Sequence, residues 1–205
     1  MARDTHSIVK MSRREGYALH PKAYKALAKR TTTPGGHSGP HQRGKTSQYS
    51  LQLREKQKVK RLYGLLERQF ANLMSEATRQ PGQSGELLLQ FLEQRLDNAV
   101  YRAGFALSRR AARQLVTHGH FTLNGRRVDI PSIRLTLGDS VSLREHSQHN
   151  QYFKNLDDLS PAPAELPGWL KVNRQKFEVT ITGLPTRQEA EPDINEQLIV
   201  EYYSR

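Results

Sequence analysis

The fold is decided by two adjoining stretches, SRRAARQLVTHG at residues 108–119 and FTLNGRRV at residues 121–128. Ser108 is a favoured N-cap and Gly119 a favoured residue just beyond a helix end, so the first stretch predicts a helix of about three turns. The second stretch holds an Asn-Gly pair between two alternating runs, which is the strongest short-range signal for a β-hairpin. Together they predict a helix followed directly by a two-stranded hairpin.

One side of the predicted helix is rich in arginine. On a helical wheel Arg109, Arg110 and Arg113 fall within one sector of about 100°, and the opposite side is apolar. Two arginines in a first turn also oppose the helix dipole, which favours acids there by about 0.3–1 kcal/mol. A helix start with open N–H groups and guanidinium side chains is suited to an anion. We therefore expect these three arginines to contact phosphate groups.

Two further arginines, Arg126 and Arg127, lie just past the predicted hairpin turn. A third strand is expected over residues 135–143. Together, the predicted elements form a basic helix packed on a small twisted sheet. Between residues 95 and 144 there are nine arginines, no lysine and three acids. Arginine suits phosphate forks and base stacking better than lysine does. The alternative is an ordinary solvated helix face, and this pattern favours nucleic acid over it.

The net charge points to a polyanionic partner. The 205 residues contain 32 Lys and Arg against 20 Asp and Glu, a formal net charge of +12 with a pI near 10.1. Residues 1–61 hold fifteen cations and three acids, so the entire excess lies there. Within the neutral remainder, residues 95–144 carry +6 and residues 145–205 carry −4. Two separate basic regions suggest a large anionic partner held at more than one place.

The expected fold class is α+β, with a helical domain, an inserted small RNA-binding domain and an extended basic N-terminal arm. The arm covers residues 1–46, with one possible short helix at 22–30. Residues 47–94 together with 178–205 form the helical domain, judged from apolar residues at helical spacing. Residues 95–177 form the inserted domain, helices on a short antiparallel sheet, with its core at 95–145 and a proline-rich connector after it. Periodicity leaves open whether residues 193–203 are helix or strand.

Several chemical motifs carry little weight. Residues 39–46 match the pattern of a phosphate-cradling loop, but no buried strand precedes them, as that loop requires. The pairs His118/His120 and His37/His41 lack further ligands nearby, so no metal site is expected. The chain has no cysteine, which excludes disulfides and thiol chemistry. No paired carboxylates or nucleophile arrangement stands out, so no catalytic residue is expected.

The longest motifs resemble one known family. Residues 95–105 (RLDNAVYRAGF), 108–116 (SRRAARQLV), 118–120 (HGH) and 124–128 (NGRRV) resemble the small-subunit ribosomal protein four family, in a bacterial-type, cysteine-free version. The resemblance runs nearly end to end, and its further motifs are SRREG at 12–16, LREKQK at 53–58, ERQF at 67–70 and NEQL at 195–198. Residues 34–49 depart from the family pattern.

The resemblance implies a structural role in translation. The family binds a helical junction in the 5′ domain of small-subunit ribosomal RNA early in subunit assembly. It also lines the messenger RNA entry path and touches ribosomal protein five, an interface linked to decoding accuracy. Some members bind zinc through cysteines in the N-terminal arm. Val9 and Ser12 stand in the corresponding region here, so the resemblance implies a zinc-free version without a cofactor.

The expected RNA contacts fall into three groups. The groups are Arg109, Arg110, Arg113, Arg126 and Arg127 in the inserted domain, then Lys56, Lys58, Lys60 and Arg61 in the helical domain, then Arg13, Arg14 and Arg43 in the arm. No apolar run approaches the roughly 18 residues that span a bilayer, and no apolar segment follows Met1. We therefore expect a cytoplasmic, ribosome-bound protein, with the choice between a bacterial and an organellar ribosome left open.

Two rival functions remain to be weighed. Pseudouridine synthases use an aspartate in a setting similar to Arg95-Leu96-Asp97, and a similar small basic domain accompanies them and some aminoacyl-tRNA synthetases. Only about sixty residues follow Glu145, too few for a catalytic domain, so Asp97 is expected to cap a helix or pair with an arginine. The second rival is a stress factor that binds stalled ribosomal subunits.

Overall fold

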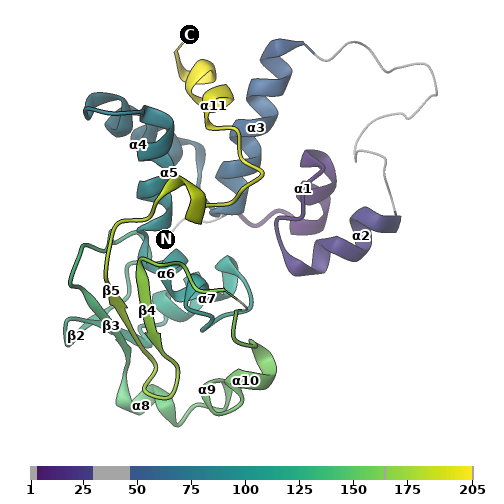
Figure 1. Cartoon of the computed structure of the whole chain (residues 1–205). Helices are drawn as coiled ribbons and strands as arrows, with labels where there is room; N and C mark the ends of the chain where they lie inside the picture. The colour runs from purple at the N-terminus through teal and green to yellow at the C-terminus, as the bar shows by residue number, and fades with distance from the viewer. Residues whose placement is uncertain (1–3, 30–46, 164, 205) are drawn as a thin grey trace. The chain divides into compact units, whose positions relative to one another are not determined.

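The structure, a computed structural model, describes residues 4–29, 47–163 and 165–204, which divide into two compact units. The first unit comprises residues 1–88 and 193–205, and the second comprises residues 89–192. The first is helical among its described residues, and the second combines helices with a five-stranded antiparallel sheet (Figure 1). The predicted α+β class is therefore confirmed.

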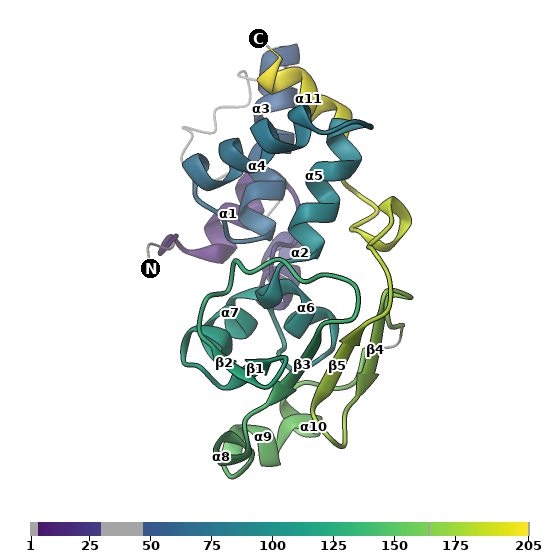
Figure 2. The same ribbon diagram turned by 90° about the vertical axis from the view of Figure 1, so that its left-hand side faces the viewer.

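The first unit is built from helices at both ends of the chain. They are α1 (Ile8–Glu15), η1 (Pro21–Ala23), α2 (Tyr24–Lys29), α3 (Gln48–Leu62), α4 (Glu67–Arg79), the first part of α5 (Ser84–Glu93) and α11 (Glu196–Tyr203). Ser47 caps α3 as its side chain accepts from the N–H of Ser50. The C-terminal segment is a helix that lies beside α3 (Figure 2), and Gln52 of α3 donates to Glu201 of α11 at 2.8 Å.

The described part of the expected arm is folded. Residues 22–29 are helical, as predicted, but α1 was not expected, and it buries Met11. The carboxylate of Glu15, at the end of α1, is completely buried and pairs with Arg54 and Arg61 of α3. These ion pairs hold α1 against α3, so residues 8–29 belong to the first unit. Residues 30–46 lie outside the described residues.

The second unit contains the predicted hairpin. Its strands are β1 (Phe121–Leu123), β2 (Arg126–Val128), β3 (Ser140–Leu143), β4 (Leu170–Asn173) and β5 (Glu178–Ile181), in the order β2-β1-β3-β5-β4. Phe121 lies opposite Val128, as the two-residue turn predicts. Asn124 and Gly125 have φ angles of 50° and 79°, the left-handed values that this turn demands and that Asn and Gly tolerate best.

Helices cover the sheet of the second unit and close its core. They are α6 (Leu96–Arg102), α7 (Arg109–Thr117), α8 (Glu145–Gln148), α9 (Gln151–Lys154), α10 (Leu156–Leu159) and η2 (Arg187–Glu189), beside the end of α5. Ser108 caps α7 by accepting from the N–H of Ala111, as predicted. The apolar side of α7 packs through Ala112 and Val116 into one core with Phe105 and Phe121. The predicted basic helix on a small sheet is thus present.

The division between the units differs from the expected boundaries. We expected residues 178–205 to return to the helical domain, but β5 pairs with β3 and places Val179 opposite Val141. Both valines are buried in the core of the second unit, so the sheet extends to Ile181 and the first unit resumes at Asp193.

In the described ranges of the chain, none of the helices has the length and apolar character needed to cross a membrane.

Candidate nucleic-acid interface

The arginines of α7 divide by burial into two largely covered side chains and an exposed one. Arg109 donates from Nε to Asn98 Oδ1 and from Nη2 to Glu191 Oε1, both at 2.8 Å, and its guanidinium carbon lies 4.6 Å from the ring centre of Tyr101. Arg113 donates to Asp97 at 3.1 Å. Their side chains are only 11% and 14% exposed. Arg110, on the same helix, is exposed.

A buried ionic network accounts for the inward direction of these side chains. Its members, which we call the Glu93–Asp97 network, form two sets of contacts. One set is Glu93, Asn98, Arg102, Arg109 and Glu191, and the other is Arg95, Asp97 and Arg113. Glu93 is fully buried and receives a bidentate fork from Arg102 at 3.0 and 2.9 Å. Arg95 likewise donates two hydrogen bonds to the carboxylate of Asp97, at 3.0 and 2.9 Å. Carboxylates of the protein thus occupy the positions in which we expected phosphate beside Arg109 and Arg113.

Asp97 has the structural role that the sequence favoured. It is 4% exposed, and Arg95 and Arg113 donate to its carboxylate. Glu93 and Glu191, in contrast, were not predicted as partners of the arginines. Glu93 ends a mostly apolar run, LLLQFLE at residues 87–93, and an acid in such a run indicates a buried partner. Glu191 gives no comparable signal, because it lies 82 residues from Arg109 along the chain.

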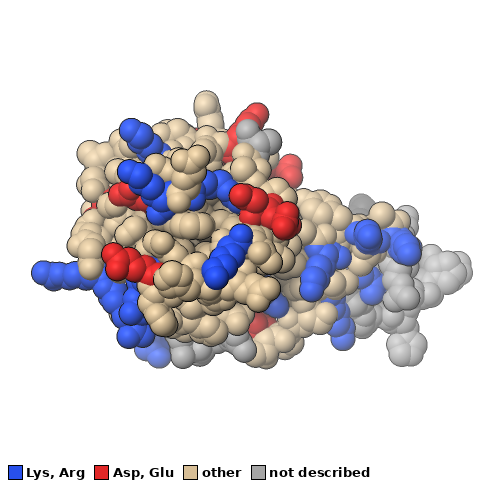
Figure 3. All heavy atoms as spheres, turned by 90° about the horizontal axis from the view of Figure 1, so that it is seen from below, with Lys and Arg blue, Asp and Glu red and all other residues tan. Residues whose placement is uncertain are grey.

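The hairpin arginines are exposed. Arg126 and Arg127 both lie on β2 with their side chains at the surface. The guanidinium of Arg127 packs against Gly119, where an added Cβ would lie 2.8 Å from its Nε. Figure 3 shows several Lys and Arg side chains along the left-hand edge of the face seen there. We call Arg126 and Arg127, together with the exposed Arg110 of α7, the hairpin surface.

The expected cations of α3 all have partners inside the first unit. Lys56 is 4% exposed and donates to Glu67 at 2.6 Å, and Lys60 donates to the same carboxylate at 2.8 Å. Lys58 pairs with Glu55 at 2.8 Å. Arg61 pairs with Glu15. These side chains stabilise the unit that they belong to, and an additional contact with RNA stays a prediction.

The third group is only partly described. Arg14 is exposed at the end of α1, and Arg13 is half-buried beside it. Arg43, His37, His41 and the loop-like motif at residues 39–46 lie outside the described residues. Their expected roles therefore stay predictions.

The Glu67 cluster makes the first unit sensitive to acid. Burial tends to raise the pKa of Glu67, but hydrogen bonds from Lys56, Lys60 and Tyr203 outweigh it and lower the pKa to about 2. Burial and the Glu67 charge in turn raise the pKa of Tyr203. A carboxyl whose pKa is depressed by folding stabilises the protein above its unfolded pKa, here near 4.5, and that contribution is lost as the pH falls toward 2.

Replacing Glu67 with Gln is therefore expected to flatten the acid limb of the stability curve. The melting temperature of the wild type should fall between pH 5 and pH 2 more steeply than that of Glu67→Gln, while the variant should be less stable near neutral pH. The measurement is thermal unfolding as a function of pH. Glu86→Gln, which removes an exposed carboxylate of α5, is the matched control. Equal slopes for Glu67→Gln and the wild type would contradict the assignment.

His120 is part of the packing of the second unit. Its Nδ1 lies 3.1 Å from the Ser147 hydroxyl, and its ring meets Phe153 edge-on. Burial, together with the neighbouring His118 and Arg144, lowers the pKa of His120. Among the described residues no group of three or more potential ligands is placed to hold a metal ion.

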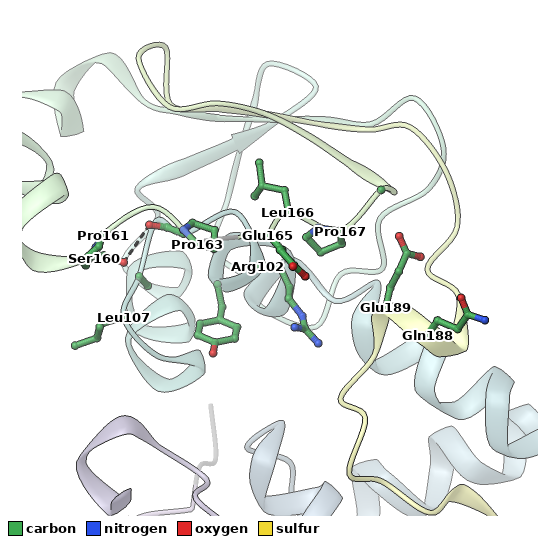
Figure 4. A pocket seen from close by; sticks show the side chains of 14 residues that line it. Arg102, Leu107, Ser160, Pro161, Pro163, Glu165, Leu166, Pro167, Gln188 and Glu189 are labelled. Atoms are coloured by element: carbon green, nitrogen blue, oxygen red, sulfur yellow. Dashed lines mark hydrogen bonds between the residues drawn. The ribbon is translucent and has the colours of Figure 1, made fainter.

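The second unit also contains a cavity of about 440 Å³ beneath the proline-rich segment (Figure 4). Its lining includes the carboxylates of Glu165 and Glu189 and the guanidinium of Arg102. Arg102 is already bound to Glu93, so the charge that remains along the lining is acidic. Such a cavity disfavours phosphate, and we therefore leave it out of the nucleic-acid interface.

The sequence matches known protein families over most of its length. Residues 3–93 match a family model described as the ribosomal protein S4/S9 N-terminal domain, and residues 94–141 match the S4 domain. Proteins named small ribosomal subunit protein uS4 from Roseiflexus castenholzii and Chloroflexus aurantiacus are each 48% identical over 206 residues. One of the same name from Clostridioides difficile is 48% identical over 211 residues. In each comparison the match covers 100% of both chains.

Proposed function

The chain belongs to the small-subunit ribosomal protein S4 family, and from this premise we propose that it is a structural, ribosomal RNA-binding component of the small ribosomal subunit. The observation that carries the proposal is the full-length similarity to proteins of that name. The exposed arginines of the hairpin surface support it, because guanidinium groups at a surface are suited to phosphate.

We further propose the finer role that the family resemblance implies. The chain would bind a helical junction in the 5′ domain of small-subunit RNA and nucleate assembly of the subunit body. It would also contact ribosomal protein five, border the messenger RNA entry path and support translational accuracy. Two basic regions of the sequence, residues 1–61 with a net charge of +12 and residues 95–144 with a net charge of +6, suit a partner that is bound at more than one place.

The geometry favours two different roles for the arginines expected to contact RNA, direct contact for some and a structural role for others. Arg110, Arg126 and Arg127 are exposed, and we assign direct phosphate contact to them. Arg109 and Arg113 act indirectly, since their bonds to Glu191 and Asp97 fix α7 and hence the position of Arg110. This modifies the sequence-based expectation that all three arginines of α7 contact phosphate.

The enzyme alternative finds no support at Asp97. A catalytic aspartate must reach its substrate, but this carboxylate is buried and accepts hydrogen bonds from Arg95 and Arg113. The proposal is therefore restricted to binding and structure.

Fractionation of ribosomal subunits tests the proposed function. The full chain should sediment with mature small subunits and stay with them through a high-salt wash, in unstressed and stressed cells alike. A structural component that makes many phosphate contacts within a folded particle should resist this treatment, although simple surface contacts weaken with salt. Release by the wash, or association only under stress, would favour the stress-factor alternative and contradict the proposal.

A further inference from the structure

The short helix α2 presents an aromatic side chain to solvent. Tyr24 is 66% exposed, although a tyrosine ring is a large apolar surface that proteins usually cover. None of the residues of α2 is buried. On a helical wheel Tyr24, Lys25, Ala28 and Lys29 share one exposed sector of about 140°. The ring therefore lies at the edge of a basic face.

The helix α2, which carries this basic face, is held in place by the folded part of the first unit. Ala23, directly before Tyr24, is completely buried, and His20 caps the preceding turn by accepting from the N–H of Lys22. Residues of η1 and α2 contact α1, which is held to α3 through Glu15. Tyr24 is thus displayed by a folded element of the first unit (Figure 1).

The sequence around Tyr24 indicates that a partner at this face is negatively charged. No Asp or Glu occurs between Glu15 and Glu55, while the same residues include four lysines and three arginines. Lys22, Lys25 and Lys29, close to Tyr24 in the sequence, are exposed. A segment that combines an exposed aromatic ring with cations and contains no acids is complementary to a polyanion that has flat apolar groups.

We propose that Tyr24 stacks on an unpaired base of ribosomal RNA while Lys22, Lys25 and Lys29 contact the phosphates beside it. This rests on the proposed function and deepens it by naming the kind of nucleotide at one contact. Bases within a duplex are stacked on each other, so only a looped, bulged or terminal nucleotide offers its face to the ring. The stacking is tolerant of base identity, because every base has such a face.

Salt-dependent binding separates stacking from charge. The full chain is titrated with a transcript of the 5′ domain of small-subunit ribosomal RNA at several salt concentrations. Tyr24→Leu should weaken binding by about tenfold at every concentration and leave the salt slope unchanged, because stacking releases no counterions. Tyr24→Phe should bind as the wild type does. Lys22→Gln/Lys25→Gln should reduce the slope by about 1.4–1.8.

The outcomes distinguish this inference from the function on which it rests. If the wild type does not bind the transcript, the proposed function fails. If the wild type binds and Tyr24→Leu binds equally well with an unchanged melting temperature, only the stacking inference is overturned. It is also overturned if Tyr24→Leu keeps its RNA affinity but loses a neighbouring protein from reconstituted subunits, since Tyr24 would then contact protein.

Discussion

Replacing Arg126 and Arg127 together with glutamine is expected to weaken binding to small-subunit ribosomal RNA by about 100-fold or more. A hydrogen bond to a charged group contributes about 1.5–3 kcal/mol, which is at least tenfold in affinity for each arginine. The salt slope should fall by about 1.4–1.8, because two phosphate contacts are lost. The fold should persist, since both side chains are exposed at the end of the sheet.

A matched pair of exposed cations provides the control. Lys171 and Lys176 lie on and beside β4, at the opposite edge of the same sheet, so Lys171→Gln/Lys176→Gln removes the same charge from a different place. The control should bind RNA much more tightly than the hairpin variant does. If the two variants lose equal affinity, net charge and not position governs binding, and the hairpin surface is the wrong assignment. The measurement is equilibrium titration of the 5′-domain transcript over a range of salt concentrations.

Replacing Glu93 with Ala is expected to lower the free energy of unfolding by about 3–5 kcal/mol. Removal of one partner from a buried ion pair leaves the other charge without compensation, and that is the larger part of the loss. Here that charge is Arg102, which is bound to both oxygens of Glu93 and would keep only its longer contact with Glu191, at 3.5 Å. Asn98 also donates to this carboxylate, so its amide would lose a partner as well.

Denaturant unfolding of the full chain, followed by tryptophan fluorescence, measures this loss. Trp169 is the single tryptophan and is buried in the second unit, so its signal reports on the unit that contains Glu93. Glu165→Ala removes an exposed carboxylate from the same unit and should change the free energy of unfolding by less than about 0.5 kcal/mol. A loss below about 1 kcal/mol for Glu93→Ala would contradict the importance of the network.

Local signals in the sequence predicted the local structure correctly. The Ser108 cap and the Asn-Gly hairpin turn are present because each depends on a few neighbouring residues and on backbone angles that those residues favour. The register of β1 and β2 followed from the turn alone. The pairing of β5 with β3 could not be anticipated in this way, because no turn links the two strands.

The direction of the arginines depended on distant residues. A helical wheel shows which side chains share a side of α7, but not which part of the chain covers that side. Glu191 covers Arg109 from 82 residues away, and Glu15 similarly binds Arg61 from 46 residues away. Charge counting identified an excess of cations in residues 1–61, but it could not separate the cations that face solvent from those that hold the fold.

The most direct test is a density map of the small ribosomal subunit that contains this chain. We expect the guanidinium groups of Arg126 and Arg127 to contact phosphate oxygens of the RNA, while Arg109 and Arg113 keep their bonds to Glu191 and Asp97. A map in which the hairpin faces bulk solvent, and in which Arg109 and Arg113 leave these carboxylates to contact the RNA backbone, would contradict the account.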